Sequence, residues 1–356
     1  MGCRRGANRV LARFRRRIVR ARCCAARFLH CVTMTSPRVL LFPGQGAQAV
    51  GMGRAWLDRS AEARAVMERA DRALAGELPG GASLSQLCLH GPAEVLNRTD
   101  VSQPAILAVS AASLAGWLAE TGAGSIREAG VVAAAGLSLG EYSALYAAGA
   151  LSLEDSLRLV LLRGRAMQEA AGASAGGMVA LIGASDEQAA QVCAAAVARA
   201  EGPGQVLVCA NFNAPGQVVI SGSAGACAVA AATDGPAAAL GLRATPLQVA
   251  GAFHSPLMEP AAERLGAALE RAPVLAPGCV VWSNVTAQAH SSDAASVRLG
   301  LRRQLTEPVR WSSSCLAMAR AYPGAEFHEF APGKTLAGLF RRIDRGVRVV
   351  GHDEPA

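Results

Sequence analysis

A serine, a histidine and an arginine in this chain have types and positions that suit chemistry at a carbonyl group. The serine is Ser138, in the GxSxG sequence Gly136-Leu137-Ser138-Leu139-Gly140. An apolar run before it predicts a strand, and the stretch from Glu141 predicts a helix, which is the context of a nucleophilic serine. In such a turn the hydroxyl projects at the helix N-terminus and the Leu139 N–H can bind an oxyanion. An ordinary β-α turn is the alternative interpretation.

A serine nucleophile needs a base, and His254 is the best placed of the six histidines. An expected strand ends just before it, Ser255 is a favourable N-cap, and Pro256 suits the first helical position. The dipole of a helix N-terminus would disfavour the imidazolium and keep the neutral, basic form. A purely structural role for this loop histidine stays open.

Arg163 is the third residue of interest, because it lies on the apolar side of a predicted helix over 152–171. Its neighbours three and four positions away are apolar, namely Leu159, Val160, Ala166 and Met167. A permanently charged guanidinium in that place extends to solvent, pairs with a buried acid, or binds an anionic ligand such as a carboxylate. All three interpretations remain open from the pattern alone.

A glycine-rich stretch at 43–49, PGQGAQA, follows the first predicted strand and formally fits the dinucleotide fingerprint G-x-G-x-x-A. Glu62 and Glu68 lie near the expected acidic offset, but they belong to a regularly charged amphipathic helix. A Walker motif fails, because Gly333-Lys334-Thr335 would need glycine where His328 stands. Nucleotide binding is therefore the minor hypothesis for this loop.

The elements that must position these residues alternate between short apolar runs and alanine-rich helices, which is typical of an α/β protein with a parallel sheet. We expect strands over 39–42, 129–135, 280–283 and, as the final strand, 327–330. Helices are expected over 103–121, 141–150, 152–171 and 256–272, with a basic helix after the final strand.

The stretch from 174 to 250 has a different texture, in the order β-α-β-β-α-β. Strands are expected over 178–182, 206–210, 217–221 and 243–249, with helices over 186–200 and after 221. This order predicts a small ferredoxin-like domain at 174–250. It would be inserted into a large, α/β-hydrolase-like catalytic domain made of 35–173 and 251–350, with a parallel central sheet.

The net charge of +8 suggests nucleic-acid or membrane binding, but its distribution argues against both. Residues 1–34 hold ten arginines and no acid, so 25 basic and 27 acidic residues remain beyond them. With 51% apolar and 17% charged residues, the chain is neither disordered nor collagen-like. The uncharged stretch 206–233 is broken by polar residues, proline and glycines, so no transmembrane helix is expected.

The segment 1–34 is expected to lie outside the fold, either as a presequence or as an over-extended start before Met34. A start at Met34 predicts a cytoplasmic protein, and a presequence predicts a mitochondrial or plastid matrix protein. Four of the ten cysteines fall in this segment, and the other six lack ligand spacing. We therefore expect a reduced, metal-free protein. A monomer is a separate expectation.

Taken in order, these motifs resemble the malonyl-CoA:acyl carrier protein transacylase family, the acyltransferases of fatty acid and polyketide synthesis. The likeness spans residues 38–350. It rests on blocks found here as Phe42-Pro43-Gly44-Gln45-Gly46, the Ser138 turn with Glu141, Arg163 with Met167-Gln168-Glu169, Asn213-Ala214-Pro215-Gly216-Gln217-Val218-Val219-Ile220-Ser221-Gly222, Ala252-Phe253-His254-Ser255-Pro256-Leu257-Met258, Ser283-Asn284-Val285, and Gln304-Leu305 with Pro308-Val309 and Trp311.

The resemblance implies that Ser138 attacks the thioester of malonyl-CoA while His254 removes its proton. Backbone N–H groups of Gln45 and Leu139 would hold the oxyanion. Arg163 would pair with the free malonyl carboxylate. The main-chain carbonyl of Gln304, rather than an acid, would orient the histidine. After CoA leaves, the phosphopantetheine thiol of acyl carrier protein would accept the malonyl group, in a ping-pong cycle without cofactor or metal.

This chain departs from the family pattern at Leu137, where many members have histidine, which changes the polarity of one pocket wall. Ala47 replaces a frequent serine. Phe253 fits the malonyl type, whose ring limits room for an α-methyl branch, so malonyl is expected over methylmalonyl. Eight arginines could form a positive surface for the acidic carrier protein, and scattered solvated side chains are the alternative interpretation: Arg298, Arg302, Arg303, Arg310, Arg341, Arg342, Arg345 and Arg348.

Three alternatives remain at this point. A polyketide-type acyltransferase would use the same residues. A serine hydrolase of acyl thioesters would combine Ser138 with Asp234 and His328, in the chain order Ser, acid, His. A catalytically silent protein that binds carrier protein would need none of them.

Overall fold

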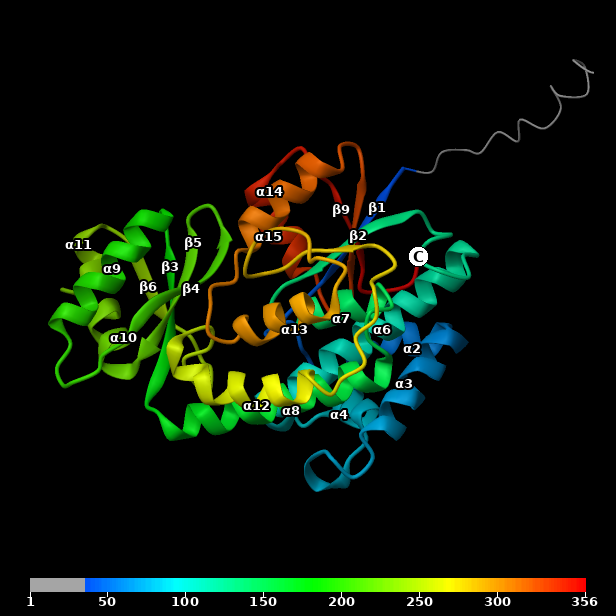
Figure 1. Cartoon of the computed structure of the whole chain (residues 1–356), viewed down its shortest axis with the longest axis horizontal. Helices are drawn as coiled ribbons and strands as arrows, with labels where there is room; N and C mark the ends of the chain where they lie inside the picture. The colour runs from blue at the N-terminus through cyan, green and yellow to red at the C-terminus, as the bar shows by residue number, and fades with distance from the viewer. Residues whose placement is uncertain (1–35) are drawn as a thin grey trace, which may run out of the picture. The chain divides into compact units, whose positions relative to one another are not determined.

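The computed structural model describes residues 36–356, and the expected presequence or start at Met34 lies outside this range. The described chain contains a parallel sheet of five strands in the order β7-β2-β1-β8-β9 and an antiparallel sheet of four in the order β4-β5-β3-β6 (Figure 1). The expected fold class, α/β with a parallel central sheet and a second small sheet, is confirmed.

Alternation of side chains along the parallel strands divides the core into two layers. In β1, Leu40 and Phe42 belong to one hydrophobic cluster, whereas Val39 and Leu41 belong to the other. Both faces are therefore buried, which explains why the strand is apolar without alternation. The parallel strands are β1 (Arg38–Phe42), β2 (Val131–Gly136), β7 (Val280–Val281), β8 (Glu326–Phe330) and β9 (Val349–His352).

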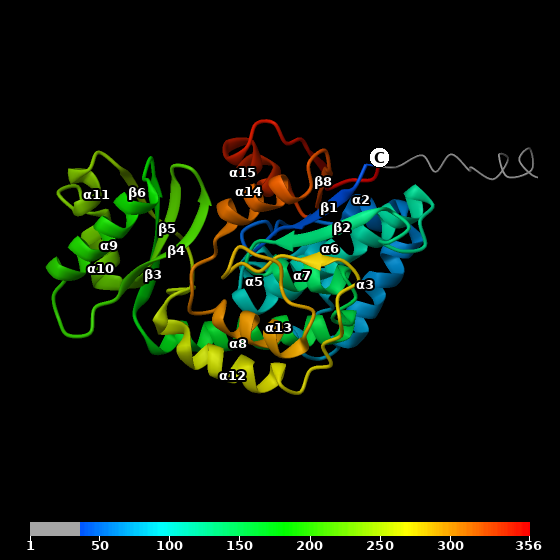
Figure 2. The same ribbon diagram turned by 45° about the horizontal axis from the view of Figure 1, so that its top comes forward.

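Helices cover both faces of the parallel sheet, as Figure 2 shows for α14 and α15 on one side and α6 and α8 on the other. The first face is covered by α14 (Trp311–Ala321) and α15 (Thr335–Ile343). The cluster on the opposite face draws on α2 (Arg54–Arg59), α3 (Ala61–Ala73), α4 (Leu84–His90), α5 (Ala93–Leu96), α6 (Thr99–Thr121), α7 (Gly140–Ala147), α8 (Leu153–Ala173), α12 (Glu259–Leu269) and α13 (Ala294–Arg303).

Helix α6 is the longest helix of this core and is apolar on all sides. Among the described residues it is the one helix with the length and mean hydropathy, 1.4, of a membrane span. Within the protein, however, 89% of that apolar window is buried. A helix that is hydrophobic all round is expected at the centre of a large core, which is where α6 lies.

The antiparallel sheet has helices on one face only. Val179 and Leu181 point to α9, α10 and α11, whereas Met178 and Val219 belong to the large core on the other face. The second face of this sheet is thus available to form one wall of a cleft. The elements are β3 (Gly176–Ile182), α9 (Asp186–Arg199), β4 (Leu207–Ala214), β5 (Gln217–Ser223), α10 (Ala224–Ala231), α11 (Pro236–Ala239) and β6 (Arg243–Pro246).

Two expectations about the C-terminal half are wrong. The strand at 327–330 is not the final one, because β9 pairs in parallel with β8 beyond it. Only two of its four residues are aliphatic, so no apolar run marked it. The expected helix over 256–272 is a 3-10 turn, η2 (Pro256–Met258), followed by α12 (Glu259–Leu269). A further 3-10 turn, η1, spans Pro79–Gly81.

Candidate active site

The GxSxG sequence forms a sharp turn between β2 and α7 that only glycine permits at two positions. A Cβ on Gly136 would lie 2.0 Å from the backbone of Gly140, and one on Gly140 would lie 2.2 Å from the carbonyl oxygen of Phe42. Ser138 between them has a left-handed backbone, with φ of 51°. This turn carries the hydroxyl out of the sheet and into a cleft.

The loop after β1 packs against the same turn. A Cβ on Gly44 would lie 2.4 Å from the carbonyl oxygen of Leu137, so glycine is required for this approach. Between β1 and Arg54 no helix begins, whereas a dinucleotide-binding loop opens directly into one. The nucleotide-binding hypothesis for 43–49 is therefore wrong, and the loop instead forms an edge of the serine site.

His254 reaches Ser138 from the segment that follows β6. Its Nε2 lies 2.9 Å from Ser138 Oγ, and its Nδ1 lies 2.6 Å from the carbonyl oxygen of Gln304. Because that carbonyl only accepts, Nδ1 carries the proton and Nε2 is free to accept the serine hydroxyl. His254 also has a left-handed backbone, with φ of 57°, and Ser255 caps η2 as expected.

The ionisation of His254 is shifted towards the neutral form. Burial, and secondly the nearby Arg163 guanidinium, lower the pKa of His254 to about 4, against the opposing effect of the Gln304 carbonyl. The expected cause, a helix dipole, is replaced by desolvation, since η2 has only three residues. The imidazole is therefore neutral and able to accept a proton at neutral pH.

Arg163 lies on α8 and points at the serine. Its Nη2 donates to Ser138 Oγ at 3.0 Å and to Gln304 Oε1 at 3.0 Å, and its Nη1 donates to Gln103 Oε1 at 2.8 Å. The residue is 1% exposed, and among the described residues no carboxylate pairs with it. Burial lowers the pKa of this guanidinium, and the Tyr142 ring lies 5.7 Å from its central carbon. Of the three interpretations, a cation that awaits an anionic ligand fits best.

Two backbone N–H groups beside the serine have no acceptor within residues 36–356, those of Gln45 and Leu139. Leu139 is fully buried, where an unpaired N–H is unusual. Such donors next to a nucleophile are suited to an oxyanion that is present only during reaction.

The serine opens into a cleft of about 660 Å³ between the two sheets. The parallel-sheet side contributes the 43–49 loop, the turn at Ser138, and α8. The antiparallel-sheet side contributes Met178, Val219 and the chain after β6. The residues that border the cleft are Gly44, Gln45, Gly46, Gln48, Glu94, Asn97, Arg98, Thr99, Leu137, Ser138, Arg163, Met167, Gln168, Met178, Asn211, Asn213, Val219, Leu247, Gln248, Val249, Ala250, Phe253 and His254.

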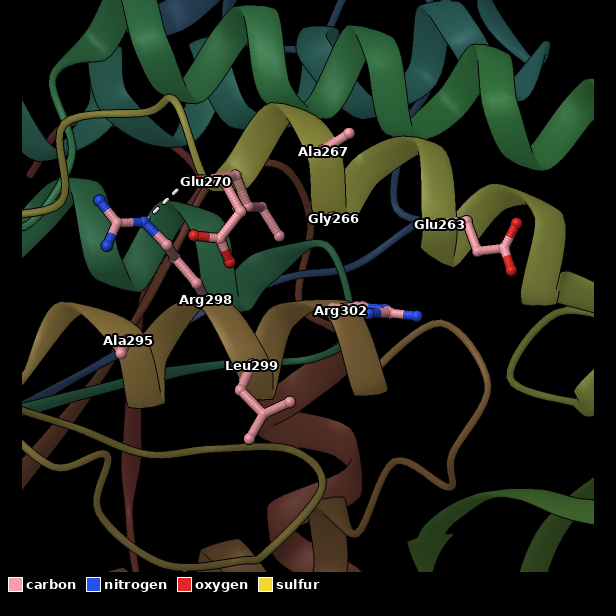
Figure 3. Close-up of a pocket in the computed structure, with 9 residues that line it drawn as sticks. Glu263, Gly266, Ala267, Glu270, Ala295, Arg298, Leu299 and Arg302 are labelled. Carbon is pink, nitrogen blue, oxygen red and sulfur yellow. Dashed lines mark hydrogen bonds between the residues drawn. The ribbon is translucent and has the colours of Figure 1, made fainter.

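A second hollow, of about 310 Å³, lies between α12 and α13 (Figure 3). Arg298 crosses it, and its Nε donates to the carbonyl oxygen of Leu269 at 2.8 Å. The other charged groups around it are Glu263, Glu270 and Arg302. No serine, cysteine or histidine borders this hollow, so it lacks the groups needed for acyl chemistry.

The residues required by a serine hydrolase are not brought together. His328 lies in β8, with its Nδ1 2.8 Å from Nε2 of His352, and Asp234 is exposed beyond α10. Neither borders the cleft. Within residues 36–356 no cluster of three or more His, Cys, Asp or Glu side chains is arranged to hold a metal ion.

Sequence reasoning missed a polar network behind the serine. Asn284 Oδ1 accepts the Ser138 N–H at 2.6 Å, and Glu141 contacts Asn284, His290 and Gln304. Glu141 and Asn284 stand within blocks of the family resemblance, and His290 belongs to none of them. A buried acid that directly follows a nucleophile turn was the available signal.

Comparison with known proteins now adds to this geometry. Residues 39–338 match the family described as acyl transferase domain. The malonyl CoA-acyl carrier protein transacylase of Salmonella typhimurium is 39% identical over 318 residues, which cover 89% of this chain and 96% of the relative. The structure of the malonyl-CoA:acyl carrier protein transacylase from Xanthomonas oryzae pv. oryzae superposes with a TM-score of 0.80 at 39% identity, covering 90% of this chain and 96% of that one.

A third similar structure is a complex, described as a holo type II polyketide synthase acyl-carrier protein with its malonyl-transacylase. The match has a TM-score of 0.79 at 35% identity and covers 90% of this chain and 97% of that chain. The match to the family model, the extent of the sequence identity and the shared fold agree. This chain therefore belongs to the acyl transferase domain family, as one of its malonyl-CoA:acyl carrier protein transacylases.

Proposed function

We propose that this protein transfers the malonyl group from malonyl-CoA to the phosphopantetheine thiol of acyl carrier protein, and so supplies malonyl-ACP for fatty acid synthesis. One observation carries the proposal. The Ser138 hydroxyl lies 2.9 Å from a neutral imidazole and 3.0 Å from a buried guanidinium that has no carboxylate partner within the described chain. A nucleophile, a base and an anion-binding group thus meet at one point of the cleft.

In the first half of the cycle, Ser138 Oγ attacks the thioester carbonyl while His254 Nε2 takes its proton. The oxyanion is held by the N–H groups of Gln45 and Leu139, and the Gln304 carbonyl stabilises the imidazolium that forms. Collapse of the tetrahedral intermediate breaks the C–S bond, and the proton passes from His254 to the leaving CoA thiolate. The product is a malonyl ester on Ser138.

In the second half, the phosphopantetheine thiol gives its proton to His254 and attacks the ester carbonyl. The C–O bond breaks, the proton returns to Ser138, and malonyl-ACP leaves. Throughout, Arg163 pairs with the free carboxylate of the malonyl group, which replaces the Ser138 hydroxyl that it contacts in the free enzyme. This contact favours a dicarboxylic acyl group over acetyl.

The acyl pocket supports a preference for malonyl over methylmalonyl. Phe253 is 5% exposed and borders the cleft beside His254, so its ring occupies the space that an α-methyl branch needs. Leu137 adds an apolar side chain to the border of the same cleft. Measured kcat/KM for the two CoA esters checks this preference, and equal values contradict it.

The carrier-protein surface that we propose is smaller than the one expected from sequence. Four of the eight arginines already have partners: Arg302 with Glu259, Arg303 with Glu307, and Arg298 and Arg310 with backbone carbonyls. The four others, on α15 and just after it, are exposed and pair with no carboxylate of the described chain. They are Arg341, Arg342, Arg345 and Arg348.

The position of α15 supports a docking role, because it packs against β4, whose Asn211 and Asn213 border the cleft. Steering by opposite charge depends on salt, so the carrier-protein KM is expected to rise with ionic strength. Reversing Arg341 and Arg342 to glutamate is expected to raise it about tenfold. A KM that neither salt nor the reversal changes argues against docking on α15.

Mass spectrometry after incubation with malonyl-CoA tests the main proposal. The expected result is a malonyl adduct on Ser138 that disappears when holo acyl carrier protein is added, and no adduct in Ser138→Ala. Malonyl transfer that persists in that variant would overturn the mechanism and leave a silent carrier-binding role. Free malonate released equally fast with and without carrier protein would indicate a hydrolase instead.

A further inference from the structure

A buried acid behind the nucleophile has no part in the reaction steps described above. Glu141 lies in the first turn of α7, its side chain is 0% exposed, and the side chain of His290 beside it is 3% exposed. A carboxylate buried to this degree persists only when its oxygens are well supplied with donors. Two of the residues that donate to Glu141, Asn284 and Gln304, also contact the catalytic groups.

Both oxygens of Glu141 are occupied. Oε1 accepts from His290 Nε2 at 2.6 Å, and Oε2 accepts from Gln304 Nε2 at 2.6 Å and from the Asn284 N–H at 3.1 Å. An ionised carboxylate can only accept, so each of these three groups must present a hydrogen to it. The carboxylate therefore dictates which way the Gln304 amide faces.

The nitrogen and the oxygen of the Gln304 side-chain amide contact different catalytic residues. Its Nε2 also donates to the carbonyl oxygen of Ser138 at 2.9 Å, and its Oε1 accepts from Arg163 at 3.0 Å. Its main-chain carbonyl receives His254 Nδ1. A reversed amide would set its N–H groups against those of the guanidinium, which can only donate. Glu141 opposes that reversal with the shortest of the contacts that the amide makes.

A second arm of the network reaches the turn itself. Asn284, whose N–H is bound by Glu141, donates from Nδ2 to the carbonyl oxygen of Gly136 at 2.7 Å and accepts the Ser138 N–H at 2.6 Å. His290 supports the other side. It packs so closely on α13 that a Cβ at Gly300 would lie 2.9 Å from its ring, and Gln304 caps that same helix.

We propose that Glu141 is a positioning residue for malonyl transfer and acts through Gln304. Its carboxylate, held by His290, orients the Gln304 amide so that Arg163 keeps its acceptor and His254 keeps its carbonyl partner. The inference rests on the proposed function, because it concerns how the acyl-binding cation and the base are aimed. Neither Glu141 nor His290 takes part in the chemical steps described above. Their role in this proposal is to hold the groups that do.

The first test is Glu141→Gln, assayed with malonyl-CoA and acetyl-CoA. Displacement of a catalytic group by about 1 Å can cost about 100-fold, so kcat/KM for malonyl-CoA is expected to fall about 10- to 100-fold. Acetyl-CoA has no carboxylate for Arg163 and is expected to lose less. The preference for malonyl over acetyl should therefore fall about tenfold. A purely structural role for Glu141 would not change this preference.

Variants of His290 provide a second measurement. His290→Gln keeps an amide hydrogen near the position of Nε2 and is expected to retain most of the activity, whereas His290→Leu should match Glu141→Gln. The double variant Glu141→Gln/His290→Leu should be no worse than either single change, because all three act through the same carboxylate. Additive losses would contradict the pairing.

Glu329→Gln is the matched control. Glu329 is also fully buried, but it accepts the N–H groups of Leu336 and Ala337 at 2.7 Å, at the start of α15, and does not border the cleft. This variant should lower the melting temperature and leave the malonyl preference unchanged. An equal fall of that preference in Glu329→Gln, or an unchanged preference in a folded Glu141→Gln, would overturn the inference. Absence of malonyl transfer by the wild-type protein would instead defeat the proposed function.

Discussion

Within residues 36–356, two places hold buried or partly buried histidines beside an arginine, and only one of them faces the cleft. His254 lies against Ser138, with Arg163 close by. His328 and His352 stack with ring centroids 5.1 Å apart, and Arg38 lies over the adjoining Trp117. Burial lowers the pKa of both His254 and the partly buried His352 to about 4, so the pKa does not distinguish the two places.

The difference lies in what the ring nitrogens contact. His254 is held by a carbonyl on one nitrogen and faces a hydroxyl with the other, which leaves one acceptor for a proton in transit. His328 and His352 bond to each other, so one lone pair is already taken by the neighbouring ring. A shifted histidine pKa indicates a candidate site. The hydrogen-bond partners of the ring then determine whether the histidine can serve as a base.

Replacing the two histidines is expected to give the largest contrast. His254→Ala removes the base and should lower kcat/KM for malonyl transfer about 10³-fold, within the range for general acid–base catalysis. His352→Gln should stay within about twofold of wild type, since the ring borders no part of the cleft. Steady-state assays of both purified variants check this, and comparable losses in both would erase the distinction.

Replacing the two arginines is expected to give a smaller contrast. Arg163→Met removes hydrogen bonds from a charged donor, each worth about 1.5–3 kcal/mol, and should lower kcat/KM for malonyl-CoA about 10- to 100-fold. Acetyl-CoA should be much less affected. Arg38→Met, beside the other histidines, should leave the ratio of the two substrates unchanged. Competition between the two CoA esters measures that ratio directly.

Lowering the pH provides a third contrast between the two places, in activity and in stability. Both effects are expected to be smallest near neutral pH. With a pKa of about 4, His254 stays neutral above that pH, so kcat/KM should be level at neutral pH and fall only towards pH 4. Protonation of His352 affects stability alone, whereas protonation of His254 affects both stability and activity. Unfolded histidine binds a proton below about 6.5 whereas folded His352 does so only near 4, so the free energy of unfolding decreases across this interval as the pH falls.

His352→Gln tests the stability part of that prediction. The slope of the unfolding free energy against pH gives the number of protons taken up on unfolding. Between pH 6.5 and 4, this number should be smaller by about one in the variant than in wild type. Denaturant titrations at several pH values give the slope. A slope equal to that of wild type would mean that His352 is already protonated in the folded protein, and the contrast with His254 would then be sharper than described.

Local signals allowed much of the fold and the principal side chains to be predicted. The turn at Ser138 is encoded by glycines close in sequence, and the α8 position of Arg163 by helical spacing, so both could be recognised without the fold. The orientation of the Gln304 amide depends on Glu141, Asn284 and His290, which meet only in three dimensions. Strand β9 was missed for a similar reason, since pairing with β8 rather than its own composition makes it a strand.

The left-handed backbones of Ser138 and His254 mean that activity and stability oppose each other at these two positions. Such a conformation costs a non-glycine residue about 1–2 kcal/mol, and glycine adopts it freely. Ser138→Gly or His254→Gly thus removes this conformational cost from the folded state and removes a reacting group at the same time. The inactive variants can be as robust as the enzyme, which makes them practical scaffolds for trapping malonyl-CoA or a carrier protein in complex.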